Sequence, residues 1–135
     1  LLLEQAFIIF RLNPLSRNLR NEINKSRKIY FWDTGIRNAV ISNFQPLSLR
    51  TDSGALWENF FISERIKVYG YLPQKPNYYF WRTHLQQEID FIEEQEGVQK
   101  AFEIKWSPTK KVKFSKSYRD AYPEHETHVV NQDTF

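Results

Sequence analysis

The chain has 135 residues, of which 41% are hydrophobic and 26% are charged, and its formal net charge is +3 at pH 7. This length suits one domain with an apolar core. The absence of cysteine excludes disulfides and thiolate metal sites, and no apolar run is long enough to cross a membrane. Because no signal-like segment opens the chain, we expect a cytoplasmic protein without a membrane partner.

The first fifty residues predict short elements separated by turns. In chain order these are a helix end at residues 1–6, a strand at 7–12, a turn-rich segment at 13–26, a strand at 27–32, a helix to about residue 41 and a loop at 42–52. Asp33 or Thr34 can cap the short helix. The sequence contains no methionine and begins inside a helical pattern, so we expect a piece of a longer protein.

The remaining residues predict a helix, three strands, a helix and a strand. Their expected bounds are a helix at residues 53–69, strands at about 77–83, 87–93 and 98–106, a basic helix at 110–121 and a strand at 127–131. Residues 94–97 contain a glycine between the second and third strands, which favours a hairpin turn.

The strongest chemical signal lies in the strand at residues 98–106, where Glu103 and Lys105 alternate with Phe102, Ile104 and Trp106. Side chains two apart share a face of a strand, so the charges occupy one face and the apolar rings should pack under a helix. If the strands at 87–93 and 98–106 are neighbours, Asp90 lies about 4.8 Å from Glu103. The alternative is a cross-strand salt bridge on a solvated face.

Two carboxylates and a lysine are the minimum chemistry for metal-assisted hydrolysis of a phosphodiester. The charge distribution favours such a substrate. Residues 100–119 hold seven basic side chains and one acidic one, residues 11–28 are also basic, and residues 88–96 hold five acidic side chains. Basic stretches that flank an acidic strand suit a DNA or RNA backbone, although such stretches are also ordinary solvated surfaces.

The order of elements from residue 53, with Asp90 followed by Glu103-Ile104-Lys105 on the next strand, resembles the PD-(D/E)XK nuclease-like superfamily. The resemblance implies an α/β fold with a restriction endonuclease-like core, in which a mixed sheet is flanked by helices. It implies Mg²⁺ or Mn²⁺ at Glu58, Asp90 and Glu103, with Lys105 orienting the attacking water.

Two residues near this predicted site have alternative interpretations. Glu58 is either a metal ligand or a surface carboxylate beside a buried Trp57. Arg82 either joins the site from the first of the three strands or pairs with Glu88.

A second resemblance covers nearly the whole chain. Five blocks carry it in order: residues 28–37, 54–60, 80–83, 88–92 and 103–105. Together they are similar to the C-terminal domain of unknown function in many bacterial and archaeal AAA-type ATPases. The resemblance implies a P-loop ATPase module before Leu1. This chain has no P-loop motif, so ATP would bind only in that absent part.

The two resemblances imply a small α+β region at residues 1–50 that links to the ATPase and a nuclease-like α/β domain at 53–135. One hypothesis is a metal-dependent module that binds or hydrolyses nucleic acid. The alternative is a non-catalytic module that binds a partner or regulates the ATPase. The sequence leaves catalysis, the choice between DNA and RNA, and the oligomeric state open.

Overall fold

The computed structural model describes residues 1–17 and 20–135, and its centre is a six-stranded mixed sheet. The elements are α1 (Leu2–Gln5), β1 (Ile9–Pro14), β2 (Lys28–Phe31), α2 (Thr34–Val40), the 3-10 helix η1 (Leu47–Leu49), α3 (Ser53–Gly70), β3 (Asn77–Arg82), β4 (Glu88–Gln95), β5 (Val98–Ile104), α4 (Lys116–Ala121) and β6 (His125–Val130). Residues 18 and 19, within the predicted turn-rich segment 13–26, lie outside the described residues.

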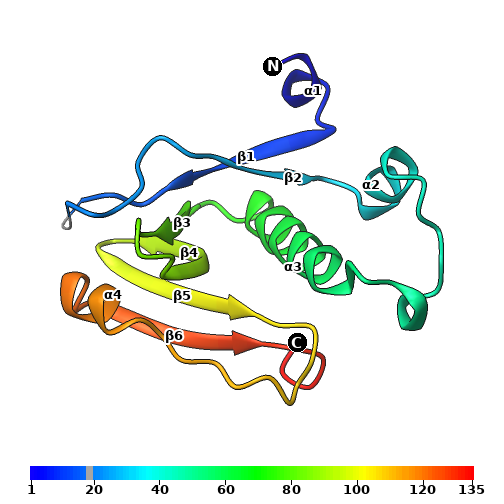
Figure 1. Ribbon diagram of the computed structural model, residues 1–135. Helices are drawn as coiled ribbons and strands as arrows, with labels where there is room; N and C mark the ends of the chain where they lie inside the picture. The colour runs from blue at the N-terminus through cyan, green and yellow to red at the C-terminus, as the bar shows by residue number, and fades with distance from the viewer. Residues whose placement is uncertain (18–19) are drawn as a thin grey trace.

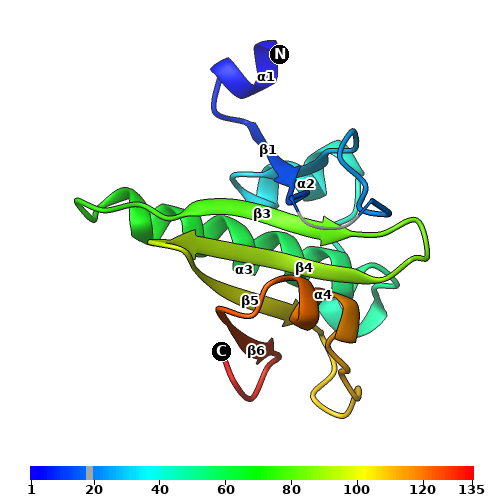
Figure 2. The ribbon, with the colours of Figure 1, turned by 90° about the vertical axis from the view of Figure 1, so that its left-hand side faces the viewer.

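The strand order is β2-β1-β3-β4-β5-β6 (Figure 1). Neighbouring strands are antiparallel except for the β1–β3 and β5–β6 pairs, which are parallel. Helices α3 and α4 lie on opposite faces of the sheet (Figure 2). The predicted α/β class, with a mixed sheet flanked by helices, is confirmed. Among the described residues, no helix is both long and apolar enough to span a membrane.

The face of the sheet under α3 carries the aromatic core. Phe102 and Ile104 of β5 are each 4% exposed and pack in one cluster with Phe61 and Ile62 of α3. The rings of Phe61 and Phe102 lie 5.6 Å apart, centre to centre. The predicted alternation along β5 is therefore confirmed, because a shift of one residue would have turned these rings away from the helix.

The opposite face packs against α4. Trp81 and Tyr118 are fully buried there, with 5.4 Å between their ring centres. Tyr122 lies one helical turn beyond Tyr118 in the same cluster, which also contains Ile89 and Ile92 of β4. Both faces of the central strands are thus covered.

The predicted basic helix at residues 110–121 is wrong in its start, because the helix begins only at Lys116. Ser115 accepts a hydrogen bond from the Tyr118 amide and caps it. Residues 107–114 lack an apolar stripe of helical spacing, so nothing offsets the cost of ordering their lysines as a helix. Lys110, Lys111 and Lys113 lie in an irregular segment between β5 and α4.

The β4–β5 hairpin has the predicted turn. Glu96 and Gly97 both have positive φ, 53° and 82°, and Gln95 pairs with Val98 on either side of them. Positive φ at both central residues is the signature of a tight two-residue hairpin turn. The turn fixes the register that places Phe91 opposite Phe102.

A bulge in β4 lies next to the predicted site. Trp81 pairs with Ile89 and Tyr79 pairs with Ile92, so three steps along β4 oppose two steps along β3. The irregularity lets Ile89 and Ile92 face the same cluster and frees Asp90 from strict alternation. Bulges of this kind commonly re-aim a side chain near a functional site.

Strands β1 and β2 extend the same sheet as the later strands. Asn13 and Pro14 pair in parallel with β3. The Asn59 side chain of α3 donates to the Phe31 carbonyl at 2.8 Å and accepts from the Phe31 amide at 2.9 Å. The division of the chain near residue 50 stays a prediction, and residues on both sides of it build one sheet.

Candidate functional site

Three predicted site residues meet at one end of the sheet. Asp90 lies near the start of β4, and Glu103 and Lys105 lie at the end of β5. The Lys105 ammonium donates to Asp90 Oδ2 at 2.9 Å and to Glu103 Oε2 at 2.8 Å. The Ile104 amide donates to the same Asp90 oxygen at 2.8 Å. The two carboxylates therefore share one cation and face each other across neighbouring strands.

Burial and mutual charge shift the pKa values of Glu103 and Lys105. Glu103 is 7% exposed, and its burial together with the charge of Asp90 raises the pKa of its carboxyl to about 7. Burial alone would lower the pKa of Lys105, but the charges of Asp90 and Glu103 outweigh it and raise that pKa above its ordinary value. Lys105 is thus a cation at neutral pH, while Glu103 exchanges a proton there.

Glu58 lies on α3 but contacts strand β2. Its Oε1 accepts from the Tyr30 hydroxyl at 2.5 Å and from the Lys28 ammonium at 3.2 Å. Within the described residues, no three acidic or histidine side chains are grouped closely enough to hold a metal ion. The structure brings Asp90 and Glu103 together but holds Glu58 in a separate cluster, so its predicted role as a ligand stays a prediction.

Lys28 and Tyr30 were missed by the sequence reasoning. Both project from β2, and burial with the nearby charge of Glu58 raises the pKa of the Tyr30 hydroxyl far above its ordinary value. Burial would lower the pKa of Lys28, but Glu58 and Glu88 together raise it. The available signal was their spacing of two residues, which puts them on one face of a strand.

Arg82 pairs with Glu88, which confirms one of the two alternatives for this residue. The Arg82 guanidinium lies 2.9 Å from Glu88 Oε2, and the Lys28 ammonium lies 2.5 Å from Glu88 Oε1. Glu88 therefore links Arg82 of β3 to Lys28 of β2, and Lys28 in turn contacts Glu58 of α3. This second network joins four elements and closes the end of the sheet beside the Asp90 trio.

A groove of about 560 Å³ opens beside the site. Glu88, Glu103 and Lys105 line one side of it. The other side is the irregular segment before α4, with Lys111 and Lys113, and the first residue of α4, Lys116. Lysines across from partly buried carboxylates form a site of mixed charge, which can receive an anion and a cation together.

Comparisons with known proteins place this chain in a family. Residues 53–134 match the family described as Domain of unknown function (DUF4143). The chain belongs to the DUF4143 family. Residues 1–47 match a second family, Domain of unknown function (DUF8612). All four predicted site residues, Glu58, Asp90, Glu103 and Lys105, lie in the DUF4143 match, whereas Lys28 and Tyr30 lie in the DUF8612 match.

Two curated relatives are similar to this DUF4143 chain. They are Uncharacterized protein Rv2008c of Mycobacterium tuberculosis (strain ATCC 25618 / H37Rv) and Uncharacterized protein Mb2031c of Mycobacterium bovis (strain ATCC BAA-935 / AF2122/97). Each is 32% identical over 121 residues, which cover 88% of this chain and 26% of the relative. The chain thus spans about a quarter of the length of these relatives. No solved structure gives a significant match.

Proposed function

We propose that this chain is a nuclease-like module that binds nucleic acid at the Asp90–Glu103–Lys105 site and hydrolyses a phosphodiester there with Mg²⁺ or Mn²⁺. The observation that carries the proposal is the convergence of two carboxylates and a lysine beside a groove lined by further lysines. A PD-(D/E)XK core and an AAA-type ATPase as the remainder of a longer protein are parts of the same proposal.

The donor set fits a weakly held divalent cation. Mg²⁺ often binds proteins through one or two carboxylates and keeps several waters, with substrate phosphates as further ligands. The raised pKa of Glu103 comes from its burial and from repulsion by the charge of Asp90, and added positive charge relieves that repulsion. Glu58 would have to give up Lys28 and Tyr30 to become a third ligand.

Each group in the proposed site has a separate task. A divalent cation, when bound, would supply charge that polarises the phosphodiester. Asp90 and Glu103 would hold it, and Lys105, released from one of them, would donate to a phosphate oxygen or to the attacking water. Lys111, Lys113 and Lys116 would contact neighbouring phosphates along the groove.

Metal binding is tested by titration calorimetry with Mn²⁺ on the chain and on Asp90→Asn. We expect binding that the variant loses and that weakens from pH 8 to pH 6, because a proton competes for Glu103. Glu64→Gln is the matched control, since Glu64 pairs with Lys67 on the exposed side of α3. Equal binding by all three proteins would remove Asp90 from the ligand set.

Catalysis is tested with labelled single- and double-stranded DNA and RNA in Mn²⁺ or Mg²⁺, using both this chain and a longer relative with ATP. We expect cleavage that Lys105→Ala abolishes while folding and metal binding persist. Cleavage that survives the combined replacement of Asp90, Glu103 and Lys105 by alanine would come from another site or a contaminant, and would overturn the proposal.

A non-catalytic module is the second candidate, and the position of Glu58 favours it. Glu58 contacts Lys28 and Tyr30 instead of the site. Among the described residues, the carboxylates paired with Lys105 are those of Asp90 and Glu103. This candidate predicts binding without cleavage. Oligonucleotide affinity should fall with salt by roughly 0.7–0.9 log units per log unit of salt for each phosphate contact. Replacing Lys111 and Lys113 by glutamine should reduce this dependence of affinity on salt. If the chain binds neither DNA nor RNA, the result would instead favour a protein partner.

A further inference from the structure

Lys28 of β2 connects the groove beside the proposed metal site with the separate contacts of Glu58. Its ammonium lies 3.2 Å from Glu58 Oε1 of α3 and 2.5 Å from Glu88 Oε1 of β4. Glu88 in turn lines the groove together with Glu103 and Lys105. The charge of Lys28 is therefore one ion pair away from the wall of the proposed site.

Lys28 is a fixed, partly buried cation. Its side chain is 16% exposed, and its ammonium lies 5.5 Å from the centre of the fully buried Phe80 ring. Burial would lower the pKa of this ammonium, but the charges of Glu58, Glu88 and Asp90 raise it. Lys28 and Asp90 thus lie within electrostatic range of each other, and a metal ion held by Asp90 would be repelled by the same ammonium.

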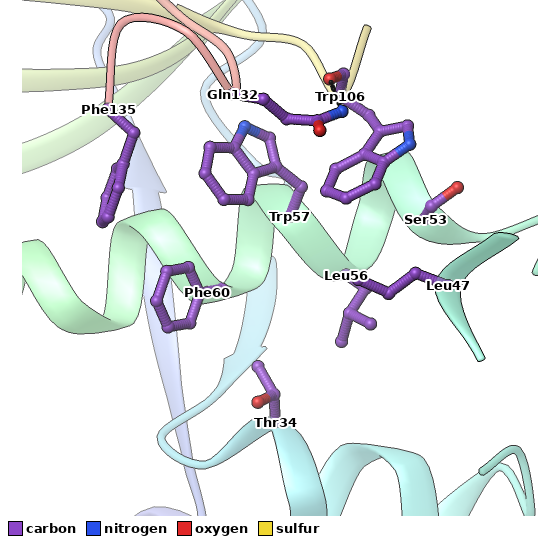
Figure 3. Close-up of a pocket in the computed structure, with 9 residues that line it drawn as sticks. All are labelled: Thr34, Leu47, Ser53, Leu56, Trp57, Phe60, Trp106, Gln132 and Phe135. Atoms are coloured by element: carbon purple, nitrogen blue, oxygen red, sulfur yellow. Dashed lines mark hydrogen bonds between the residues drawn. The ribbon is translucent and has the colours of Figure 1, made fainter. Parts of the chain in front are cut away.

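The Glu58 carboxylate is directed toward β2. Figure 3 shows Trp57 and Phe60 of the same helix along a pocket of about 440 Å³. Glu58 follows Trp57 by about 100° around the helix, and its Oε1 accepts from the Tyr30 hydroxyl at 2.5 Å and from the Lys28 ammonium. Two donors from one strand therefore set the direction of this carboxylate.

We propose that Lys28 is a positioning residue that limits the affinity of the Asp90–Glu103 site for a divalent cation. Its charge opposes that of the metal, and its ion pair with Glu58 keeps a third carboxylate out of the site. The proposal rests on the proposed function and adds to it a control of metal binding. Lys28 lies in the DUF8612 match and the three carboxylates lie in the DUF4143 match, so a segment of one family sets the metal affinity of the other.

The test is titration calorimetry with Mn²⁺ at pH 8 on the chain, Lys28→Gln and Lys28→Arg, with urea unfolding to show that each variant is folded. We expect Lys28→Gln to bind Mn²⁺ at least roughly fivefold more tightly. Removing a unit charge roughly 8 Å from a divalent ion has about this effect even in a medium as polar as water. Lys28→Arg keeps the charge and should bind like the wild type. Lys67→Gln is the matched control, because it removes the same charge from the exposed side of α3 and should leave the affinity unchanged.

Two further variants assign the gain to the Glu58 carboxylate. Adding Glu58→Gln to Lys28→Gln should reduce the gain in Mn²⁺ affinity, because glutamine lacks the charge of a carboxylate ligand. Tyr30→Phe removes the other contact of Glu58 without changing any charge. It should raise the Mn²⁺ affinity by a smaller factor, and it takes the place of Lys28→Gln if that variant does not fold.

A purely structural role for Lys28 predicts weaker metal binding in Lys28→Gln, so tighter binding distinguishes the two roles. If the wild type binds Mn²⁺ and these variants bind it equally or more weakly, the role of Lys28 is overturned and the proposed function stands. An undiminished gain in the double variant would overturn the part assigned to Glu58. If neither the wild type nor any variant binds Mn²⁺, the proposed metal-dependent function fails, and the role of Lys28 fails with it.

Discussion

Glu103 should make the stability of this protein depend on pH, and Glu103→Gln should remove that dependence. Burial and the charge of Asp90 raise the pKa of this carboxyl from 4.5 to about 7 in the folded protein. The folded state therefore binds a proton at Glu103 more tightly than the unfolded chain does. Its stabilising effect is fully present below pH 4.5 and is lost as the pH rises through about 7.

The magnitude follows from the two pKa values. The folded and unfolded pKa values differ by about 2.5. At about 1.36 kcal/mol for each pKa unit, this difference corresponds to roughly 3 kcal/mol of unfolding free energy. Glutamine stays neutral at every pH, and Lys105 keeps its contact with Asp90 in the variant. The unfolding free energy of Glu103→Gln minus that of the wild type should therefore increase by about 3 kcal/mol between pH 4.5 and pH 8.

The assay is urea unfolding followed by tryptophan fluorescence at several pH values, in EDTA so that no divalent cation occupies the site. Glu64→Gln is the control, because the Glu64 side chain is 44% exposed and pairs with Lys67 within α3. The unfolding free energy of Glu64→Gln minus that of the wild type should change by less than about 0.5 kcal/mol between pH 4.5 and pH 8. A constant difference for Glu103→Gln, or one that shrinks toward pH 8, would refute the claim that folding raises the pKa of this buried carboxyl.

Three further changes test the packing that positions the site. Phe102→Ala should lower the unfolding free energy by about 3–5 kcal/mol in urea, whereas Val98→Ala, at a 42% exposed position of the same strand, should cost less than about 1 kcal/mol. Asn59→Ala should cost about 2–3 kcal/mol, because it leaves both the amide and the carbonyl of Phe31 without the side-chain partner; little change in urea would show that these groups find other partners. Gly97→Ala should cost about 1–3 kcal/mol, because φ at this position is 82°, and a higher thermal midpoint would contradict the assigned turn.

Local features of this protein follow from its sequence alone. The alternation along residues 101–106 predicts which side chains of β5 are buried, because the period of a strand is two and one face must cover a core. Glu96-Gly97 predicts a tight turn, and Asp33 predicts a helix start, where its Oδ1 accepts from the Ile36 amide at 2.9 Å. Each of these depends on neighbouring residues and on backbone conformations that those residues prefer.

The start of α4 shows where local reasoning fails. Lys110, Lys111 and Lys113 have ordinary helix propensity, and the sequence therefore extends the predicted helix through them. In the structure the helix begins where Tyr118 and Tyr122 can be buried against the sheet. A short helix is stable only where tertiary packing offsets its ordering cost, and the propensity of isolated residues does not contain that information.

Some contacts of the site were likewise predictable from the sequence, and others were not. The pairing of Asp90 with Glu103 and Lys105 was predictable, because consecutive strands joined by a tight hairpin bring these side chains together. The contacts of Glu58 with Lys28 and Tyr30 were not predictable from the sequence. These residues are 30 and 28 positions from Glu58, and the strand order β2-β1-β3 has to form before β2 lies next to α3. The sequence by itself determined which groups carry chemistry on each strand. Only the tertiary structure decided which of those groups meet, because non-local pairing depends on the free energy of the whole sheet and not on any local pattern.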